Sequence, residues 1–267
     1  MTNRVRRLDL FDGHTAGEDP LRRSIQKHYT EVARREKACC GEDGSGASAE
    51  TPSGRLYTDD QLKLVPSDSV AASAGCGNPT AFAEIRPGDT VVDLGSGGGI
   101  DCFLAARAVG PTGNVIGMDM TAAMVELARK NAVKLGLENV AFRLAQIETI
   151  PLPAESVDVI MSNCVINLSS HKEAVFTDAF RVLKPGGKIF ISDMVLIGDL
   201  PKEVAEDPVM WSCCVGGAIR KERYLEMVRA AGFAEITTIS ETPSPAPDGA
   251  AWAGKVLSLS FRATRPA

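Results

Sequence analysis

The sequence predicts an α/β fold with a doubly wound, mostly parallel sheet of seven strands and an antiparallel strand at its C-terminal end. Three observations predict this fold. Apolar runs of strand length alternate with amphipathic runs of helix length across residues 86–233. The first apolar run breaks into a cluster of glycines. The last two are joined by a Pro- and Gly-rich connector at 241–254 in place of a helix. Such alternation places parallel strands between two layers of helices, and the helix-free connector gives an antiparallel finish.

The N-terminal part is expected to contribute helices and a loop. Residues 1–20 are expected to form a loose arm. A helix is predicted at 24–38, where a serine can cap a run of helix formers, and a second from Asp59 to near Pro66. Between them, 41–54 is rich in Gly, Ser and acidic residues, which is typical of a mobile loop.

The remaining elements follow in regular order after a turn. Strands are expected at 90–97, 114–120, 139–146, 157–165, 188–196, 235–240 and 255–264. Helices are expected at 101–110, 122–136, 172–187 and 221–233. Glycines end the first two of these helices, as they commonly do. We therefore divide the chain into an N-terminal segment at 1–80, with helices and a thiol-bearing loop, and an α/β domain at 81–267.

The composition is that of an ordinary globular enzyme, because 44% of the residues are hydrophobic and 24% are charged. The net charge of −5 and the lack of a Lys/Arg stripe argue against nucleic acid as a partner. No apolar run approaches the roughly 20 residues that a membrane helix needs. The basic start is not followed by the apolar segment of a secretory signal. We expect a cytoplasmic monomer without a membrane partner.

A glycine loop follows the first strand. Gly95, Ser96 and Gly97 stand where this strand meets a helix, so a ligand can approach the main-chain N–H groups closely. Asp119 follows about twenty residues later, where an acid can bind ribose hydroxyls. Asp93 would repel a pyrophosphate and attract an amino or sulfonium group. The loop therefore favours S-adenosylmethionine over a dinucleotide, the alternative being a plain tight turn.

Four stretches together resemble the class I S-adenosylmethionine-dependent methyltransferases, which have a Rossmann-like fold. They are VDLGSGGG, VIGMDM, QIETIPLP and AFRVLKPGGKIFISD, and the resemblance covers residues 81 to about 261. It implies that 81–267 binds the methyl donor and that Ile147 and Glu148 lie near the adenine. The predicted donor-binding residues are Asp93, Gly95, Ser96, Gly97, Asp119, Met120, Ile147, Glu148 and Asn163.

The cysteines are odd in number and include two adjacent pairs. The seven are Cys39, Cys40, Cys76, Cys102, Cys164, Cys213 and Cys214. No CxxC motif with a matching second half occurs, so a structural zinc site is not expected. Because a cytosolic compartment keeps thiols reduced, we expect free thiols, soft-metal ligands or redox-active groups and no disulfide scaffold.

Three cysteine-bearing stretches resemble the arsenite methyltransferases: AGCGNP at 74–79, SNCVINL at 162–168 and CVGGA at 214–218. DLGSGGGIDCFLAARAVG and GMDMT extend the resemblance to residues 24–261. The chemistry agrees, because trivalent arsenic is a soft centre that selects thiolates over carboxylate or imidazole. Three sulfurs leave the arsenic lone pair free to attack the sulfonium methyl carbon, and holding donor and acceptor together supplies most of the acceleration. No general base is needed.

The resemblance implies that Cys164 and Cys214 bind arsenic(III) near the donor and that Cys76 completes the site. Cys214 lies in an expected substrate-binding insertion at about 195–220. Strand order supports Cys164, because ligands of doubly wound sheets bind at the carboxyl ends of the strands, near the switch point. This cysteine ends the strand at 157–165, beside the glycine loop.

The family's N-terminal functional thiol falls on Cys40, with Cys39 as the alternative. By resemblance it forms a disulfide with Cys76 as each methylated arsenic is reduced, and thioredoxin or glutathione reopens that disulfide. The expected products are mono- and dimethylated arsenicals, as in arsenic detoxification. The adjoining segment 41–56 is expected to be poorly ordered without substrate. A C-terminal thiol site for arsenic delivery is expected to be absent, since the sequence ends with SLSFRATRPA.

Two other functions stay open. A methyltransferase of a small organic acceptor, such as a quinone, accounts for the glycine loop but leaves the three cysteine stretches unexplained. A thiol-based metalloid-binding protein accounts for the cysteines but leaves the donor site without a use. Residues outside these motifs are given structural roles: Cys102 packs in the core, Cys213 is a spare thiol, and His14, His28 and His171 lie on the surface.

Overall fold

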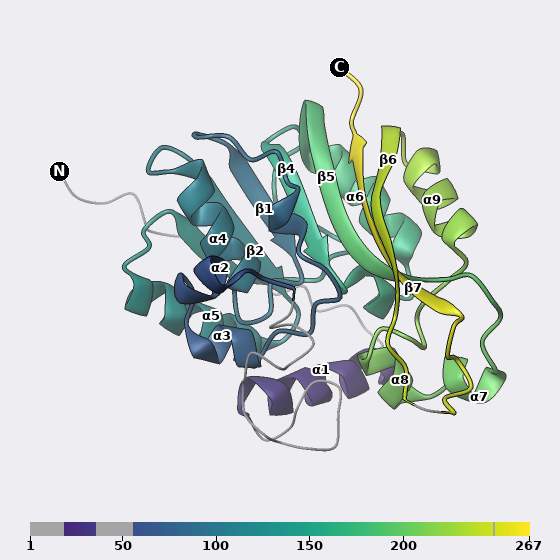
Figure 1. The fold of residues 1–267 in the computed structure, drawn as a ribbon. Helices are drawn as coiled ribbons and strands as arrows, with labels where there is room; N and C mark the ends of the chain where they lie inside the picture. The colour runs from purple at the N-terminus through teal and green to yellow at the C-terminus, as the bar shows by residue number, and fades with distance from the viewer. Residues whose placement is uncertain (1–18, 36–55, 248) are drawn as a thin grey trace.

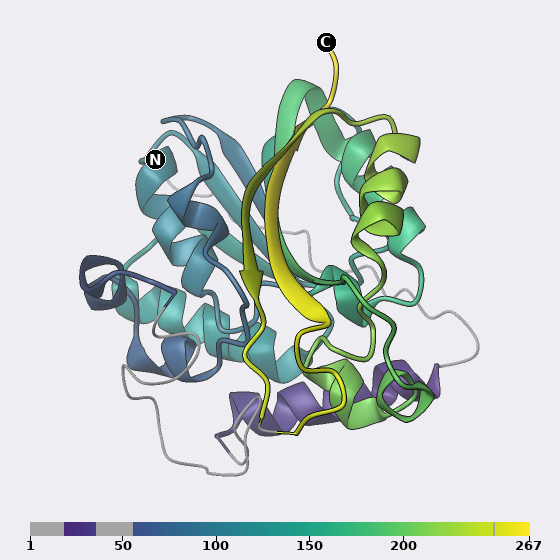
Figure 2. The ribbon, with the colours of Figure 1, turned by 45° about the vertical axis from the view of Figure 1, so that its right-hand side comes forward.

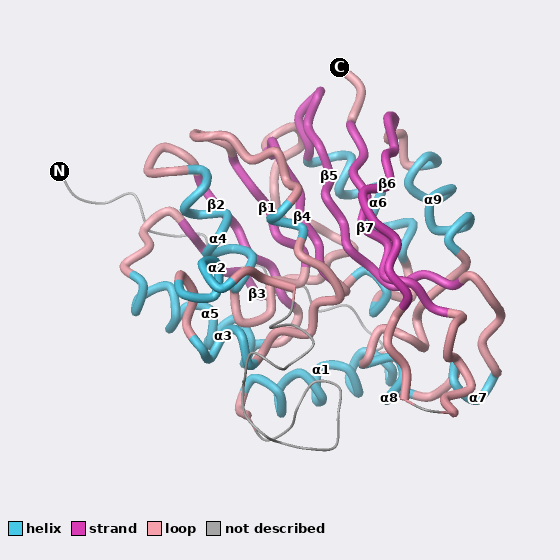
Figure 3. Tube along the Cα trace, in the orientation of Figure 1, coloured by secondary structure: helices cyan, strands magenta, loops and turns pink. Residues whose placement is uncertain are grey.

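The computed structural model describes residues 19–35, 56–247 and 249–267. A single seven-stranded sheet runs through the described part, in the order β3-β2-β1-β4-β5-β7-β6 (Figures 1 and 3). The strands are β1 Thr90–Leu94, β2 Asn114–Asp119, β3 Val140–Leu144, β4 Val157–Asn163, β5 Leu183–Leu196, β6 Ala234–Pro243 and β7 Val256–Thr264. The first five strands pair in parallel, and β7 pairs antiparallel with both β5 and β6. The predicted fold class is confirmed.

Helices cover both faces of the sheet (Figure 1). The helices are α1 Pro20–Ala33, α2 Asp59–Lys63, α3 Ser67–Ala71, α4 Ile100–Val109, α5 Ala122–Leu135, α6 Lys172–Val182, α7 Lys202–Ala205, α8 Pro208–Ser212 and α9 Lys221–Ala230, with 3-10 turns η1 Pro79–Ala81 and η2 Ile166–Leu168. One hydrophobic core joins β1 and β4 to α4 and α5, and a second joins the same strands to α6 and α9. The alternating side chains of each strand explain the two cores, because successive residues point to opposite faces.

Several helices differ from the sequence-based prediction. Helix α1 begins at Pro20, four residues early, because the Asp19 carboxylate accepts the Leu21 N–H at 3.0 Å and proline suits the first helical position. Helix α3 was not predicted. Helix α6 ends at Val182 and not in the glycine pair at its predicted end, because Leu183 already pairs with Val157 in the sheet.

The fold places distant segments along the carboxyl edge of the sheet. Helix α1 packs against α5 and α8, and both views show it lying across this edge (Figure 2). The expected insertion around 195–220 contains α7 and α8. Because α1 contacts both α8 and α5, it links this insertion to the part of the domain that carries the parallel strands. In the described ranges, no helix has the length and apolar character needed to cross a membrane.

Candidate active site

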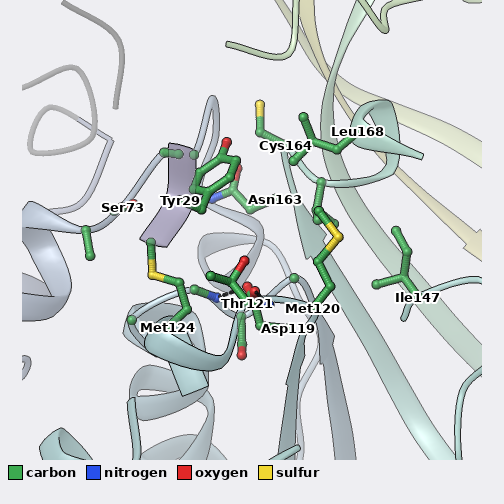
Figure 4. A pocket seen from close by; sticks show the side chains of 18 of the residues that line it. Tyr29, Ser73, Asp119, Met120, Thr121, Met124, Ile147, Asn163, Cys164 and Leu168 are labelled. Carbon is green, nitrogen blue, oxygen red and sulfur yellow. Dashed lines mark hydrogen bonds between the residues drawn. The ribbon is translucent and has the colours of Figure 1, made fainter. Parts of the chain in front are cut away.

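A cavity opens at the carboxyl ends of the parallel strands, with a volume of about 860 Å³ that includes open solvent. Figure 4 shows Asp119 and Thr121 at one end of it and Cys164 and Leu168 at the other. Most predicted donor-binding residues line it, namely Gly95, Ser96, Gly97, Asp119, Met120, Ile147, Glu148 and Asn163. The sheet topology therefore gathers residues from four strands and the loops that follow them into one site.

The glycine loop and Asp119 form one unit on the cavity wall. The Asp119 carboxylate accepts the backbone N–H of Gly97 at 3.0 Å and of Thr121 at 2.8 Å. Burial nevertheless raises the pKa of Asp119. Gly95 has a φ of 75°, and a Cβ there would lie 2.2 Å from the side chain of Val165, so only glycine fits.

The side chain of Ser96 supports a ligand at this loop. Ser96 is buried, lines the cavity, and its hydroxyl oxygen has no hydrogen-bond partner among the described residues. Buried polar atoms in proteins are nearly always paired, so the hydroxyl is suited to a polar group of a bound ligand. With the glycine backbone and the Asp119 carboxylate beside it, this wall fits a nucleoside with ribose hydroxyls.

Asp93, predicted as the acid that attracts the donor, does not line the cavity. It lies buried beneath the loop, where it accepts a hydrogen bond from the Cys102 thiol at 3.2 Å, and burial raises its pKa. Asp101 lines the cavity instead. Burial raises the pKa of Asp101 to about 6, although Tyr57 donates to its carboxylate at 2.9 Å. The sequence analysis did not single out Asp101, although its position just after the glycine loop was a signal that could have identified it.

Helix α1 supplies wall residues that the sequence analysis missed. Arg22 and Tyr29 line the cavity. The Arg22 guanidinium forms a 2.9 Å salt bridge with Glu148, whose carboxylate also accepts from the Ser169 hydroxyl at 2.7 Å. Tyr29 donates to the carbonyl of Ser212 in α8 at 3.0 Å. The two contacts that α1 makes through Arg22 and Tyr29 join residues more than a hundred positions apart in the sequence, and no local pattern encodes them.

The three predicted arsenic ligands meet at the rim of the cavity. Cys76 and Cys164 form a disulfide, with their Cα atoms 5.8 Å apart. The Cys214 thiol donates to the Cys164 carbonyl at 2.9 Å, and Cys214 is buried. Cys164 lines the cavity, and Cys76 and Cys214 contact Cys164 without lining the cavity themselves.

The disulfide partner of Cys76 in the structure is Cys164, and the sequence-based expectation was Cys39 or Cys40. Both of those residues lie outside the described residues, as do His14 and most of the segment 41–56, so these predictions stay open. In this disulfide state, the described ranges contain no cluster of three His, Cys, Asp or Glu side chains arranged to hold a metal ion.

A buried polar network surrounds the Cys214 segment. The Lys172 ammonium donates to the carbonyls of Asn167 and Ser169 at 3.2 and 2.8 Å, and burial lowers its pKa. Asp193 accepts the hydroxyl of Tyr224 at 3.0 Å, and burial raises the pKa of Asp193 to about 6. The network fixes the turn η2, which follows Cys164.

The structure also tests the residues given structural roles. Cys102 is fully buried, as predicted, and Cys213 is half-buried beside Cys214. His28 was expected on the surface, but only 7% of it is exposed, because α1 packs this face against the domain. His171 is exposed, as predicted.

Comparison with known proteins extends these observations. A family model described as a methyltransferase domain matches residues 85–232. An arsenite methyltransferase of Halobacterium salinarum is 44% identical over 83% of this chain and 60% of its own length. One from Aquipseudomonas alcaligenes is 34% identical over 86% of this chain and 67% of its own length.

A solved structure agrees with these relatives. It is an arsenic(III) S-adenosylmethionine methyltransferase from Chlamydomonas reinhardtii, which is 32% identical, with a TM-score of 0.60 over 77% of this chain and 70% of the other. The chain thus spans about 60 to 70% of the length of these proteins.

Proposed function

This chain belongs to the arsenite methyltransferase family, and from that premise we propose that it transfers methyl groups from S-adenosylmethionine to trivalent arsenic. One observation carries the proposal. Cys76, Cys164 and Cys214 come together at the rim of a cavity whose opposite wall fits a nucleoside. A donor of activated methyl groups and a thiophilic acceptor would therefore meet at Cys164.

The donor side of the proposal assigns roles to residues of the cavity wall. S-adenosylmethionine supplies a methyl group activated by its sulfonium charge. Asp119, already held by two backbone N–H groups, keeps acceptor capacity for ribose hydroxyls. Ile147 and Glu148 would flank the adenine. Asp101 lines the cavity as a carboxylate above pH 6 and would attract the cationic part of the donor.

The acceptor side requires reduced cysteines, because arsenic(III) binds thiolates. The Cys76–Cys164 disulfide takes up two of the three sulfurs. Two electrons and two protons from external thiols open it to two cysteine thiols, while the reductant forms its own disulfide. We assign this step to glutathione or thioredoxin, with Cys40, or Cys39 in its place, as the further thiol that exchanges with Cys76.

The same proposal covers the biological setting. The products would be mono- and dimethylated arsenicals, and the activity would serve arsenic detoxification. We place the protein in the cytoplasm, since its thiols need a reducing compartment. We propose that it acts as a monomer. We take residues 81–267 as the donor-binding domain and 1–80 as the N-terminal thiol-bearing segment.

Methyl transfer from labelled S-adenosylmethionine tests the function directly. The reduced protein, arsenite and glutathione should yield labelled mono- and dimethylated arsenic. Label on an organic acceptor such as a quinone, with none on arsenic, would show that the protein is a methyltransferase of small organic acceptors. Binding of arsenite through sulfur without any methylation would show a metalloid-binding protein.

Single substitutions should separate the thiols by role. We expect Cys164→Ser and Cys214→Ser to abolish methylation of both arsenite and monomethylarsenite. Cys76→Ser and Cys40→Ser should lose arsenite but keep monomethylarsenite, in which a methyl group replaces one thiolate. Cys102→Ala, which removes a thiol buried in the core, is the control with activity on both. Full activity of Cys164→Ser on arsenite would rule out this mechanism.

A further inference from the structure

The side chain of Asn163 holds the backbone of Cys76. Its amide oxygen accepts the N–H of Cys76 at 3.1 Å and of Gly77 at 3.2 Å, and its amide nitrogen donates to the Gly77 carbonyl at 2.7 Å. Asn163 directly precedes Cys164, the disulfide partner of Cys76. One side chain therefore attaches the segment that carries one cysteine to the strand end that carries the other.

A buried pair fixes which way the Asn163 amide points. Its nitrogen also lies 3.3 Å from a carboxylate oxygen of Asp101 and 3.3 Å from the hydroxyl of Tyr57. Tyr57 in turn donates to Asp101 at 2.9 Å. A flipped amide would set its oxygen against the Asp101 carboxylate and the Gly77 carbonyl. The orientation that accepts from the Cys76 N–H is therefore the one that the surroundings permit.

The Cys76 segment is also held on its other sides. The Ser258 hydroxyl, from β7, donates to the Cys76 carbonyl at 2.8 Å. A Cβ added to Gly75 would lie 2.4 Å from the Asn163 amide nitrogen, so the segment fits against this side chain only without one. The contact is tight enough that a single methyl group should push the segment away.

We propose that Asn163 is a positioning residue for the thiol pair and not a ligand of the methyl donor, which is the role that the family resemblance implied. By holding the Cys76 backbone beside Cys164, it makes two cysteines 88 residues apart behave as one dithiol. The consequence for arsenic rests on the proposed function. The thiol pairing itself is measurable without arsenic.

The test is a redox equilibrium of the intact protein with dithiothreitol. Two electrons and two protons pass from dithiothreitol, which closes to its cyclic disulfide, to the Cys76–Cys164 bond, which opens to two thiols. After acid quenching and alkylation, mass spectrometry of the linked peptides gives the oxidised fraction. Asn163→Ala should lower the equilibrium constant for formation of the Cys76–Cys164 disulfide about tenfold, since it removes several hydrogen bonds that hold the Cys76 segment. That change corresponds to about 30 mV for this two-electron couple.

Two further variants make the result specific. Gly75→Ala should shift the equilibrium in the same direction as Asn163→Ala through the steric contact alone. Asn139→Ala is the matched control: its amide nitrogen also donates to two carbonyls, of Ala106 and Gly110, at 2.8 and 2.9 Å at the opposite end of the sheet. It should leave the equilibrium unchanged.

The affinity for S-adenosylmethionine separates the two roles of Asn163. Positioning predicts that Asn163→Ala shifts the disulfide equilibrium by a larger factor than the donor affinity, which changes only through the contact with Asp101. An unchanged equilibrium with weakened donor binding would overturn the proposal and make Asn163 a donor ligand. If the unsubstituted protein fails to methylate arsenite yet Asn163→Ala shifts the equilibrium, the proposed function falls and the positioning role stands.

Discussion

Cys164 and Cys214 share an unusual backbone conformation. Their φ angles are 54° and 62°, in the left-handed region that non-glycine residues seldom adopt. The cost is about 1–2 kcal/mol for each residue relative to an ordinary conformation. Such strain persists where the surroundings hold it and gathers at functional sites. Here the two strained residues are in contact, since the Cys214 thiol donates to the Cys164 carbonyl.

Paired substitutions can measure this strain separately from the loss of sulfur. Cys214→Gly should be more stable than Cys214→Ala by about 1 kcal/mol, because glycine adopts a positive φ without cost. In helix α4 the order should reverse, so that Cys102→Gly is less stable than Cys102→Ala by about 1 kcal/mol. Urea unfolding of the reduced proteins measures both differences. If the glycine and alanine variants had the same order of stability at both sites, backbone strain at Cys214 would be contradicted.

Asp193 should make stability depend on pH. Burial raises its folded pKa to about 6, so the folded state holds a proton that the unfolded state releases near pH 4. Its stabilising contribution is full below pH 4 and is lost as pH rises through 6. The unfolding free energy, relative to that of Asp193→Asn, should therefore fall by at most about 3 kcal/mol between pH values of roughly 4.5 and 7.5. A difference that stays flat or rises with pH would contradict this assignment.

At the scale of elements, helix α1 closes the cavity. It reaches the donor wall through Arg22, which contacts Glu148, and through Gln26, which donates to the Met120 carbonyl at 3.0 Å. It reaches the thiol side through Tyr29 and α8. One helix thus contacts both halves of the site. Donor binding and the position of the Cys214 segment should be coupled through it.

Loosening α1 should weaken donor binding. Arg22→Ala removes a half-buried ion pair worth about 1 kcal/mol, so we expect about fivefold weaker binding of S-adenosylmethionine. Calorimetry measures the affinity, and hydrogen exchange of the α1 amides should speed up in the same variant. Lys27→Ala, on the exposed face of the same helix, is the control with neither effect. Unchanged α1 exchange in Arg22→Ala would show that this ion pair does not fasten the helix.

At the scale of the whole molecule, the local sequence pattern was enough to predict the sheet and the donor-binding loop. Most strands are short apolar runs and the longer helices are amphipathic or apolar, so hydrophobic pattern predicts these elements. Gly97 and Asp119 belong to a spacing that reports a βαβ unit. The pairing of Cys76 with Cys164 and the closure of the cavity by α1 depend on contacts between distant segments. Nothing in the neighbouring residues encodes them.

Long-range contacts also explain why Asp101, and not the predicted Asp93, lines the cavity. Asp93, the last residue but one of β1, is buried, and Asp101, in the first turn of α4, lines the cavity. The sequence places both beside the glycine loop, but only the packing of α4 on the sheet decides which of them faces the ligand. The charge that attracts the donor is therefore Asp101 in our account.

The central claim is that three cysteines hold arsenic(III) at the rim of the donor cavity. X-ray absorption at the arsenic K edge, on the reduced protein with one equivalent of arsenite, counts the sulfur neighbours of arsenic directly. Our account predicts three sulfur neighbours, falling to two in Cys214→Ser and staying at three in Cys102→Ala. Arsenic that keeps oxygen neighbours in the unsubstituted protein, or three sulfurs in Cys214→Ser, would contradict it.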